Sequence, residues 1–447
     1  MNEELDIKKR FLNSLKLGTG ETYLLQKEYP KADFSRQIVK GAVQNFAYDR
    51  QSEGSRANYI YGLIKKSKNR QKIEQSILSK LQVKKSDWYG LDHMCDLAVL
   101  FHKAGNQYAK EALRSRFEKN GLDEYEFCGQ DQLIEIEGLA GLLTVAEVVG
   151  KTLLKDQGDW EDSYRVDSFQ KKNKGIDVYL ELEKTSRNNK YIKAYLTSIT
   201  QNKWGLPRKR KAKIFSYSLI KERIEADKFR FISEEKANEL SDEEVKRLAE
   251  DFLREKDKYK QELFLRFFSK IKFPFEYKPI LNIAGGTDTR KSRLVEFAVD
   301  ALKFFGGEDI RKLALQKIAE YKNPSIYFPL LTGTYREGDS SLLNEVANRS
   351  RNFDYIHSIV FGIIDIYQAN PTKACKAPLE TIYSAMNCGL HRYTILKILE
   401  ENQVLSNKIL SEMQFDSYSE IRILYRSIRK TSGNQVDGST SVSGSVI

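Results

Sequence analysis

The stretch from 279 to 430 constrains the fold most, because it is a succession of short amphipathic segments. Apolar residues recur at helical spacing, and polar turns intervene, in five segments: 292–305, 309–321, 353–367, 376–386 and 390–400. Helices of this length are not stable alone, and each carries one apolar stripe that must be buried. The pattern therefore predicts consecutive helices stacked on their neighbours, with no strand among them.

Upstream of this stretch the same periodicity predicts further helices over 34–48, 55–64, 91–103 and 108–118, and one long apolar helix over 131–154. In contrast, 176–183 alternates apolar and polar residues, a pattern that fits either a strand or a helix. Both readings stay open for that segment.

Local signals in the charged middle of the chain indicate where its helices begin. Ser233 and Ser241 each precede acidic residues, which is typical of a helix N-terminus. The aromatic side chains that follow are expected to form one cluster that leads into the C-terminal array: Phe264, Phe267, Phe268, Phe273 and Phe275.

Shifts in composition divide the 447 residues into four regions. We predict an N-terminal helical region over 1–155, a charged middle region with a basic loop over 156–275, and a helical-repeat array over 276–430. The Ser- and Gly-rich residues 431–447 are predicted to be a disordered tail.

Composition also bounds the class of protein. Hydrophobic residues make up 40% and charged residues 30% of the chain, which is typical of a soluble protein with a substantial core. The four cysteines form no CxxC pair, so we expect reduced core thiols. The most apolar run, 138–150, is too short to span a bilayer, and the charged N-terminus lacks a secretory signal. These features predict a cytoplasmic protein without a membrane partner.

A degenerate pattern recurs early in three of the predicted helices: Lys, any residue, Ala or Pro, then Leu. It occurs as Lys110-Glu-Ala-Leu113, Lys312-Leu-Ala-Leu315 and Lys376-Ala-Pro-Leu379. The pattern resembles the helix pairs of HEAT and armadillo α-solenoids over 280–430, and more weakly over 87–155. The resemblance implies an all-α, extended array with a curved binding surface and no chemistry of its own. An irregular multi-helix globule is the alternative.

A phosphate-binding loop is suggested by Gly285-Gly-Thr-Asp-Thr-Arg-Lys-Ser292, which follows an apolar stretch and precedes a predicted helix. The loop requires a second glycine where this chain has Arg290, and a side chain there obstructs the approach of phosphate. We therefore favour a turn at Gly285, with Arg290, Lys291 and Arg293 exposed.

Metal-ligating and acid–base residue types gather in Asp92-His-Met-Cys-Asp96, with His102 further on. On a helix Asp92 and Asp96 share a face, whereas the two histidines do not, so the groups do not converge without a second element. Cys388 and His391 form another short pair, whose nearest sequence partner is Cys375. We predict neither a metal site nor a cofactor, and catalytic residues stay unassigned.

The net charge of +12 raises the prospect of a polyanionic partner. Residues 203–213 hold six basic residues and no acidic one, with an aromatic at their start: Lys203, Trp204, Arg208, Lys209, Arg210, Lys211 and Lys213. Such side chains neutralise phosphates, and aromatic rings stack on unpaired bases. A solvated loop that only aids solubility is the competing interpretation.

These observations predict a non-enzymatic scaffold that binds a protein partner along one face of a helical array. The alternative is a nucleic-acid-binding solenoid that uses the 203–213 run together with Arg290, Lys291 and Arg293, with a repair or nuclease activity as its extension.

Overall fold

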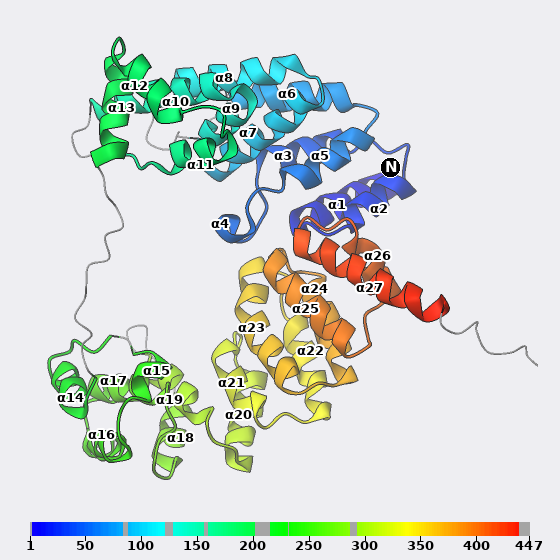
Figure 1. Ribbon diagram of the computed structural model, residues 1–447. Helices are drawn as coiled ribbons and strands as arrows, with labels where there is room; N and C mark the ends of the chain where they lie inside the picture. Colours follow the sequence, from blue (N-terminus) through cyan, green and yellow to red (C-terminus); the bar gives the residue numbers. More distant parts are fainter. Residues whose placement is uncertain are drawn as a thin grey trace, which may run out of the picture. The chain divides into compact units, whose positions relative to one another are not determined.

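The computed structural model describes residues 2–83, 88–120, 128–155, 160–201, 215–230, 232–286 and 293–437. Every secondary-structure element in these ranges is helical, which confirms the all-α prediction. The chain forms two compact units (Figure 1). Unit 1 contains α1–α13, residues 387–390, α26 and α27, and unit 2 contains α14–α24 and residues 391–406.

The helices of unit 1 are α1 (Asn2–Leu17), α2 (Glu21–Glu28), α3 (Ser35–Val43), α4 (Arg50–Glu53), α5 (Ala57–Lys66), α6 (Arg70–Val83), α7 (Trp88–Lys103), α8 (Gln107–Asn120), α9 (Gln130–Glu137), α10 (Leu139–Leu153), α11 (Tyr164–Lys172), α12 (Val178–Ser186), α13 (Lys190–Gln201), α26 (Asn407–Met413) and α27 (Ser419–Asp437).

The helices of unit 2 are α14 (Tyr217–Glu225), α15 (Glu234–Ala237), α16 (Asp242–Arg254), α17 (Lys258–Phe268), α18 (Lys278–Ala284), α19 (Leu294–Leu302), α20 (Glu308–Glu320), α21 (Phe328–Thr332), α22 (Ser340–Asn348), α23 (Phe353–Ala369) and α24 (Lys376–Tyr383). Short 3₁₀ turns precede α21, α22 and α24, and α25 (Gly389–Glu401) begins in residues assigned to unit 1 and continues in unit 2.

Alternate helices pack against each other along unit 2. α17 contacts α19, α19 contacts α21, and α21 contacts α23; in parallel, α20 contacts α22 and α22 contacts α24. In unit 1 the same relation links α1, α3, α5, α7 and α9 in turn, and also joins α6 to α8. We call this arrangement the alternate-helix ladder; its course can be followed within each unit in Figure 1.

Side-chain hydrogen bonds follow the ladder and join residues 31 to 37 positions apart in unit 2. They link Glu262 to the Arg293 amide (2.9 Å), Lys317 Nζ to the Gly285 carbonyl (2.8 Å), Arg349 to the Ile318 carbonyl (3.0 Å) and Thr381 to Asn344 (2.8 Å). Three of these bonds span one step of the ladder, and the Lys317 bond joins α20 to the end of α18, so polar groups as well as apolar stripes connect a helix to its next neighbour but one.

The single helix predicted over 131–154 is wrong, because the structure has two helices there. Gly138 has φ +60° and separates α9 from α10, which fold back on each other. The Cβ of any residue at Gly141 would lie 2.5 Å from the Leu133 carbonyl oxygen, so the two backbones meet where only glycine fits. The sequence analysis missed this turn because the spacing of apolar residues over 138–150 carries no information about the φ angle of Gly138.

Other local predictions are confirmed. The segment 176–183, for which strand and helix both stayed open, contains the start of α12, and Asp177 caps this helix by accepting from the Leu180 amide. Ser233 and Ser241 cap α15 and α16, with a full capping box between Ser241 and Glu244. The four cysteines are buried and form no disulfide with one another.

The aromatic cluster also exists. Phe268 and Phe273 lie 4.8 Å apart, Phe273 and Phe275 5.9 Å apart, and Phe252 of α16 joins them. This cluster fills the space between α16 and α17, so the charged middle of the chain has an aromatic core of its own.

The predicted regional boundaries follow composition, whereas the two units follow contacts. The boundary near 155 falls inside unit 1, and the boundary near 275 falls inside unit 2. Of the predicted tail, residues 431–437 continue α27 and residues 438–447 lie outside the described residues. Among the helices that the structure describes, none combines the length and apolarity needed to cross a bilayer.

A buried ion pair stabilises one step of the unit 2 ladder. Both guanidinium nitrogens of Arg311 donate to Asp339, each over 2.7 Å, and both side chains are 8% exposed. We expect Asp339→Ala to destabilise unit 2 by about 3 kcal/mol, because it strands the arginine charge in the interior. Chemical unfolding followed by circular dichroism measures the change.

The matched control is Glu308→Ala, which breaks the solvent-exposed ion pair with Arg336. That variant should lose less than about 1 kcal/mol. Equal losses in the two variants would contradict a structural role for the buried pair.

Candidate binding site

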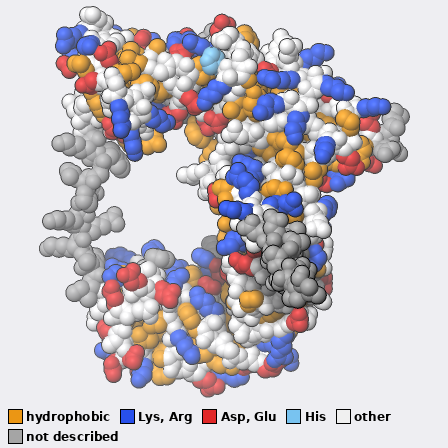
Figure 2. Space-filling view, turned by 45° about the vertical axis from the view of Figure 1, so that its right-hand side comes forward, with side chains coloured by type: hydrophobic (Ala, Val, Ile, Leu, Met, Phe, Trp, Pro, Cys, Tyr) orange, Lys and Arg blue, Asp and Glu red, His pale blue; other side chains and the backbone are white. Residues whose placement is uncertain are grey.

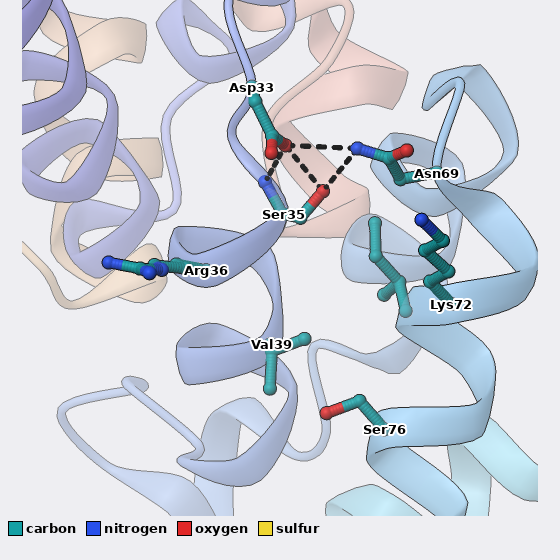
Figure 3. A pocket seen from close by; sticks show the side chains of 8 residues that line it. Asp33, Ser35, Arg36, Val39, Asn69, Lys72 and Ser76 are labelled. Carbon is teal, nitrogen blue, oxygen red and sulfur yellow. Dashed lines mark hydrogen bonds between the residues drawn. The ribbon is translucent and has the colours of Figure 1, made fainter.

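A groove lies between the first turns of α3 and α6 in unit 1. Its volume is about 410 Å³, and Figure 3 shows its lining. The lining residues are Asp33, Ser35, Arg36, Val39, Asn69, Lys72, Ile73 and Ser76. We call it the α3–α6 groove. Val39 and Ile73 make its apolar wall, and polar groups close one end.

Asp33 organises the polar end. The amide and hydroxyl of Ser35 donate to its Oδ1 over 2.9 and 2.5 Å, and the Asn69 amide group donates over 3.2 Å (Figure 3). The Asn69 amide group also donates to the Ser35 hydroxyl over 3.1 Å. The bonds from Ser35, followed by the weaker effects of Asn69 and Lys8, lower the pKa of Asp33 below its usual value. The groove therefore presents a fixed carboxylate at neutral pH.

Cationic side chains flank the same groove. Arg36 and Lys72 are both exposed and belong to α3 and α6. A ligand in the groove would thus meet one carboxylate, two cations and an apolar wall. This combination suits a peptide segment with one apolar side chain and charges of both signs.

A second groove lies between α9 and α11, with a volume of about 450 Å³. Tyr164 lines it and is 70% exposed, while Arg165 pairs with Asp131 across the groove over 3.0 Å. Its remaining charged residues are Glu135 and Lys172. An exposed tyrosine beside paired charges is typical of protein-contact surfaces.

The acidic pair on α7 does meet a second element. Gln132 of α9 donates to Asp92 over 3.1 Å and to Asp96 over 2.6 Å. Burial, and secondarily the charge of Asp96, raises the pKa of Asp92 to about 6. Burial also raises the pKa of Asp96. Sequence reasoning grouped the two carboxylates correctly but missed Gln132, because nothing in the sequence marks a residue 36 positions away as their partner.

The other polar groups of this segment do not join the pair. His93 is 1% exposed, and burial, followed by the charge of Arg56, lowers its pKa to about 3, so it is neutral at physiological pH. Cys95 is buried beside Gly129, and burial raises the pKa of its thiol. The described side chains of α7 thus form core and a carboxyl pair.

The predicted nucleic-acid-binding residues lie almost wholly outside the described residues. This applies to Lys203, Trp204, Arg208, Lys209, Arg210, Lys211, Lys213, Arg290 and Lys291. Arg293 is described. Its guanidinium pairs with Glu296 and lies 4.9 Å from the Phe297 ring, and its side chain is 60% exposed. It is therefore engaged locally while still reaching solvent.

The suggested phosphate-binding loop lacks its structural context. Residues 278–284 before it form the helix α18, where such a loop requires a strand. Gly285 continues the helical conformation, and its carbonyl accepts from Lys317. The remainder of the motif, 287–292, lies outside the described residues.

On the face shown in Figure 2, Lys and Arg side chains are interspersed with Asp and Glu. The surplus of positive charge is therefore distributed over a mixed-sign surface in this view. Comparison with models of protein families, with curated proteins and with solved structures found no match to this chain.

The Asp92 carboxyl makes stability depend on pH. The pKa of Asp92 is higher in the folded state than in the unfolded chain. The contribution of this carboxyl to the free energy of unfolding is therefore greatest below about pH 4 and is lost as the pH rises through about 6. Asp92→Asn removes the buried charge and should stabilise unit 1 by roughly 1 kcal/mol at pH 8, with little effect at pH 3.5. Urea unfolding at both pH values measures this.

Asp6→Asn provides the control, since Asp6 lies on the exposed surface of α1. The pH dependence of its unfolding should match that of the wild type. A wild-type pH slope that persists in Asp92→Asn would show that the raised pKa belongs to another group.

Proposed function

We propose that this chain is a non-enzymatic, HEAT-like helical-repeat scaffold that binds a protein partner. The observation that carries the proposal is the alternate-helix ladder, with hydrogen bonds at a nearly constant separation along the chain. In α-solenoids each repeat contacts only its neighbours, and this produces the same pattern of contacts.

The spacing of helix starts supports a repeat. α18, α20, α22 and α24 begin at Lys278, Glu308, Ser340 and Lys376, so successive starts are 30, 32 and 36 residues apart. Helix-pair repeats have periods of about 33 to 47 residues, and HEAT repeats lie at the long end of that range, so the spacings here are nearly regular but short for a HEAT repeat. Hydrogen bonds in unit 1 have similar sequence separations: Asn106 bonds to Glu74 across 32 residues, and Arg165 bonds to Asp131 across 34 residues.

The α3–α6 groove gives the scaffold a specific contact point. The Val39 side chain offers an apolar surface, and Asp33 offers an ionised carboxylate whose Oδ1 takes all the hydrogen bonds assigned to it among the described residues. Its Oδ2 can therefore accept from a lysine or arginine of the partner. We infer that the partner presents a short segment with a basic side chain next to an apolar one.

The titratable groups of the groove favour binding over chemistry. Asp33, Arg36 and Lys72 can pair with charges of a partner, and although the Ser35 hydroxyl donates to Asp33, no histidine or cysteine is among the residues that line the groove. The most strongly shifted groups of unit 1, such as His93, are enclosed in the core. This separation of perturbed groups from the grooves supports the scaffold proposal.

A pair of serine substitutions on α6 tests the proposal. Ser76 lines the α3–α6 groove, whereas Ser79 is exposed one turn later and does not line it. Ser76→Arg should fill the groove and weaken partner binding at least tenfold, and Ser79→Arg should leave it unchanged. Partners are identified by affinity capture with the wild type, and each purified complex is then measured by calorimetry.

Equal affinity of the partner for both variants would remove the groove from the proposed interface. Both variants should unfold at the temperature of the wild type, because neither serine is buried.

Nucleic-acid binding is the second candidate, supported by the net charge of +12 and the six basic residues of 203–213. In this case binding to labelled duplex or single-stranded DNA or RNA should weaken steeply with salt. A variant with Arg208, Lys209, Arg210 and Lys211 changed to Ala should lose most of the affinity. Absence of binding by the wild type at moderate salt would exclude this candidate.

A further inference from the structure

Two of the four histidines of the chain meet on unit 2. His357 lies on α23 and His391 on α25, and their ring centroids are 4.6 Å apart with the planes nearly perpendicular. The ligand nitrogens of the two rings lie within 4.8 Å of each other. The residues are 34 positions apart in the chain, which matches the separation of the ladder contacts.

Within the described part of the chain, His391 carries an unsatisfied buried nitrogen. Nδ1 of His391 is buried and has no hydrogen-bond partner among the described residues. An unsatisfied buried acceptor or donor is unfavourable, and native proteins contain few of them. An occupant that engages this nitrogen would relieve the penalty.

The surroundings limit what that occupant can be. Phe361, one turn after His357, places its ring 4.3 Å from the His391 ring and 5.5 Å from the His357 ring. This phenylalanine is 55% exposed, so it covers the imidazoles while leaving the site accessible from solvent. An apolar cover around two imidazoles suits a compact ion better than an extended organic ligand.

We propose that His357 and His391 bind a borderline-soft divalent transition metal, Zn²⁺ above all. Imidazole nitrogen is a preferred ligand of Zn²⁺, whose sites are tetrahedral and combine nitrogen and sulfur donors. Water completes the coordination.

This inference departs from the sequence-based expectation of no metal site. The sequence paired Cys388 and His391 but offered Cys375 as their nearest partner. In the structure, the partner of His391 is instead His357, which lies on α23. The proposal is independent of the proposed scaffold function, because it concerns α23 and α25 alone.

Cobalt(II) titration tests the site in the full-length protein. After removal of metal with a chelator, we expect one equivalent of Co²⁺ to bind with the visible d–d absorption of a tetrahedral ion, and Zn²⁺ to displace it. His357→Ala and His391→Ala should each weaken binding at least about a hundredfold, since loss of second-shell partners alone weakens metal sites 10- to 100-fold.

His102→Ala is the matched control, because His102 lies on α7 in unit 1. It should bind Co²⁺ with unchanged affinity and spectrum. The proposal is overturned if the wild type shows no saturable binding, or if both His357→Ala and His391→Ala retain the wild-type spectrum. Circular dichroism of each variant establishes that any loss of binding occurs in folded protein.

Discussion

The burial of one apolar stripe per helix governs this structure. Most of its helices are only two to four turns long, and helices of that length gain their stability from packing and not from propensity. Each must therefore face its neighbours, and the alternate-helix ladder is the arrangement that buries every stripe in turn. Polar bonds such as Lys317 to Gly285 repeat along it and hold successive helices in register.

Sequence periodicity predicted the helices α19, α20, α23, α24 and α25, but it assigned no helix to the segments that form α21 and α22. The helix predicted over 353–367 is α23, and the one predicted over 390–400 is α25, each differing by at most two residues at either end. Apolar spacing and capping residues are local, so they can be read without knowledge of the fold. The failure at Gly138 has the same origin, since a positive φ leaves no trace in hydrophobic spacing.

The contacts between helices could not be predicted in this way. Gln132 joins Asp92 and Asp96, and His357 meets His391, only because helices 34 to 40 residues apart are stacked. Such pairs depend on how one helix is rotated relative to another, and this orientation cannot be inferred from a single sequence. Asp33 and Asn69 of the α3–α6 groove belong to the same class, at a separation of 36 residues. A known repeat length would have reduced the search for partners to a narrow window along the chain.

Unit 1 is assembled from both ends of the chain. The Ser417 amide donates to the Gly18 carbonyl over 2.8 Å, the rings of Tyr23 and Phe415 stack 5.1 Å apart, and a Cβ at Gly20 would collide with the Glu412 carbonyl oxygen. During synthesis on the ribosome, α1 and α2 therefore emerge long before the segment that covers them. The part of their surface that meets Glu412 and Phe415 stays uncovered through the translation of nearly four hundred residues. This delay makes the first helices the natural point of contact for chaperones, and makes any premature stop upstream of 407 a source of exposed, aggregation-prone surface.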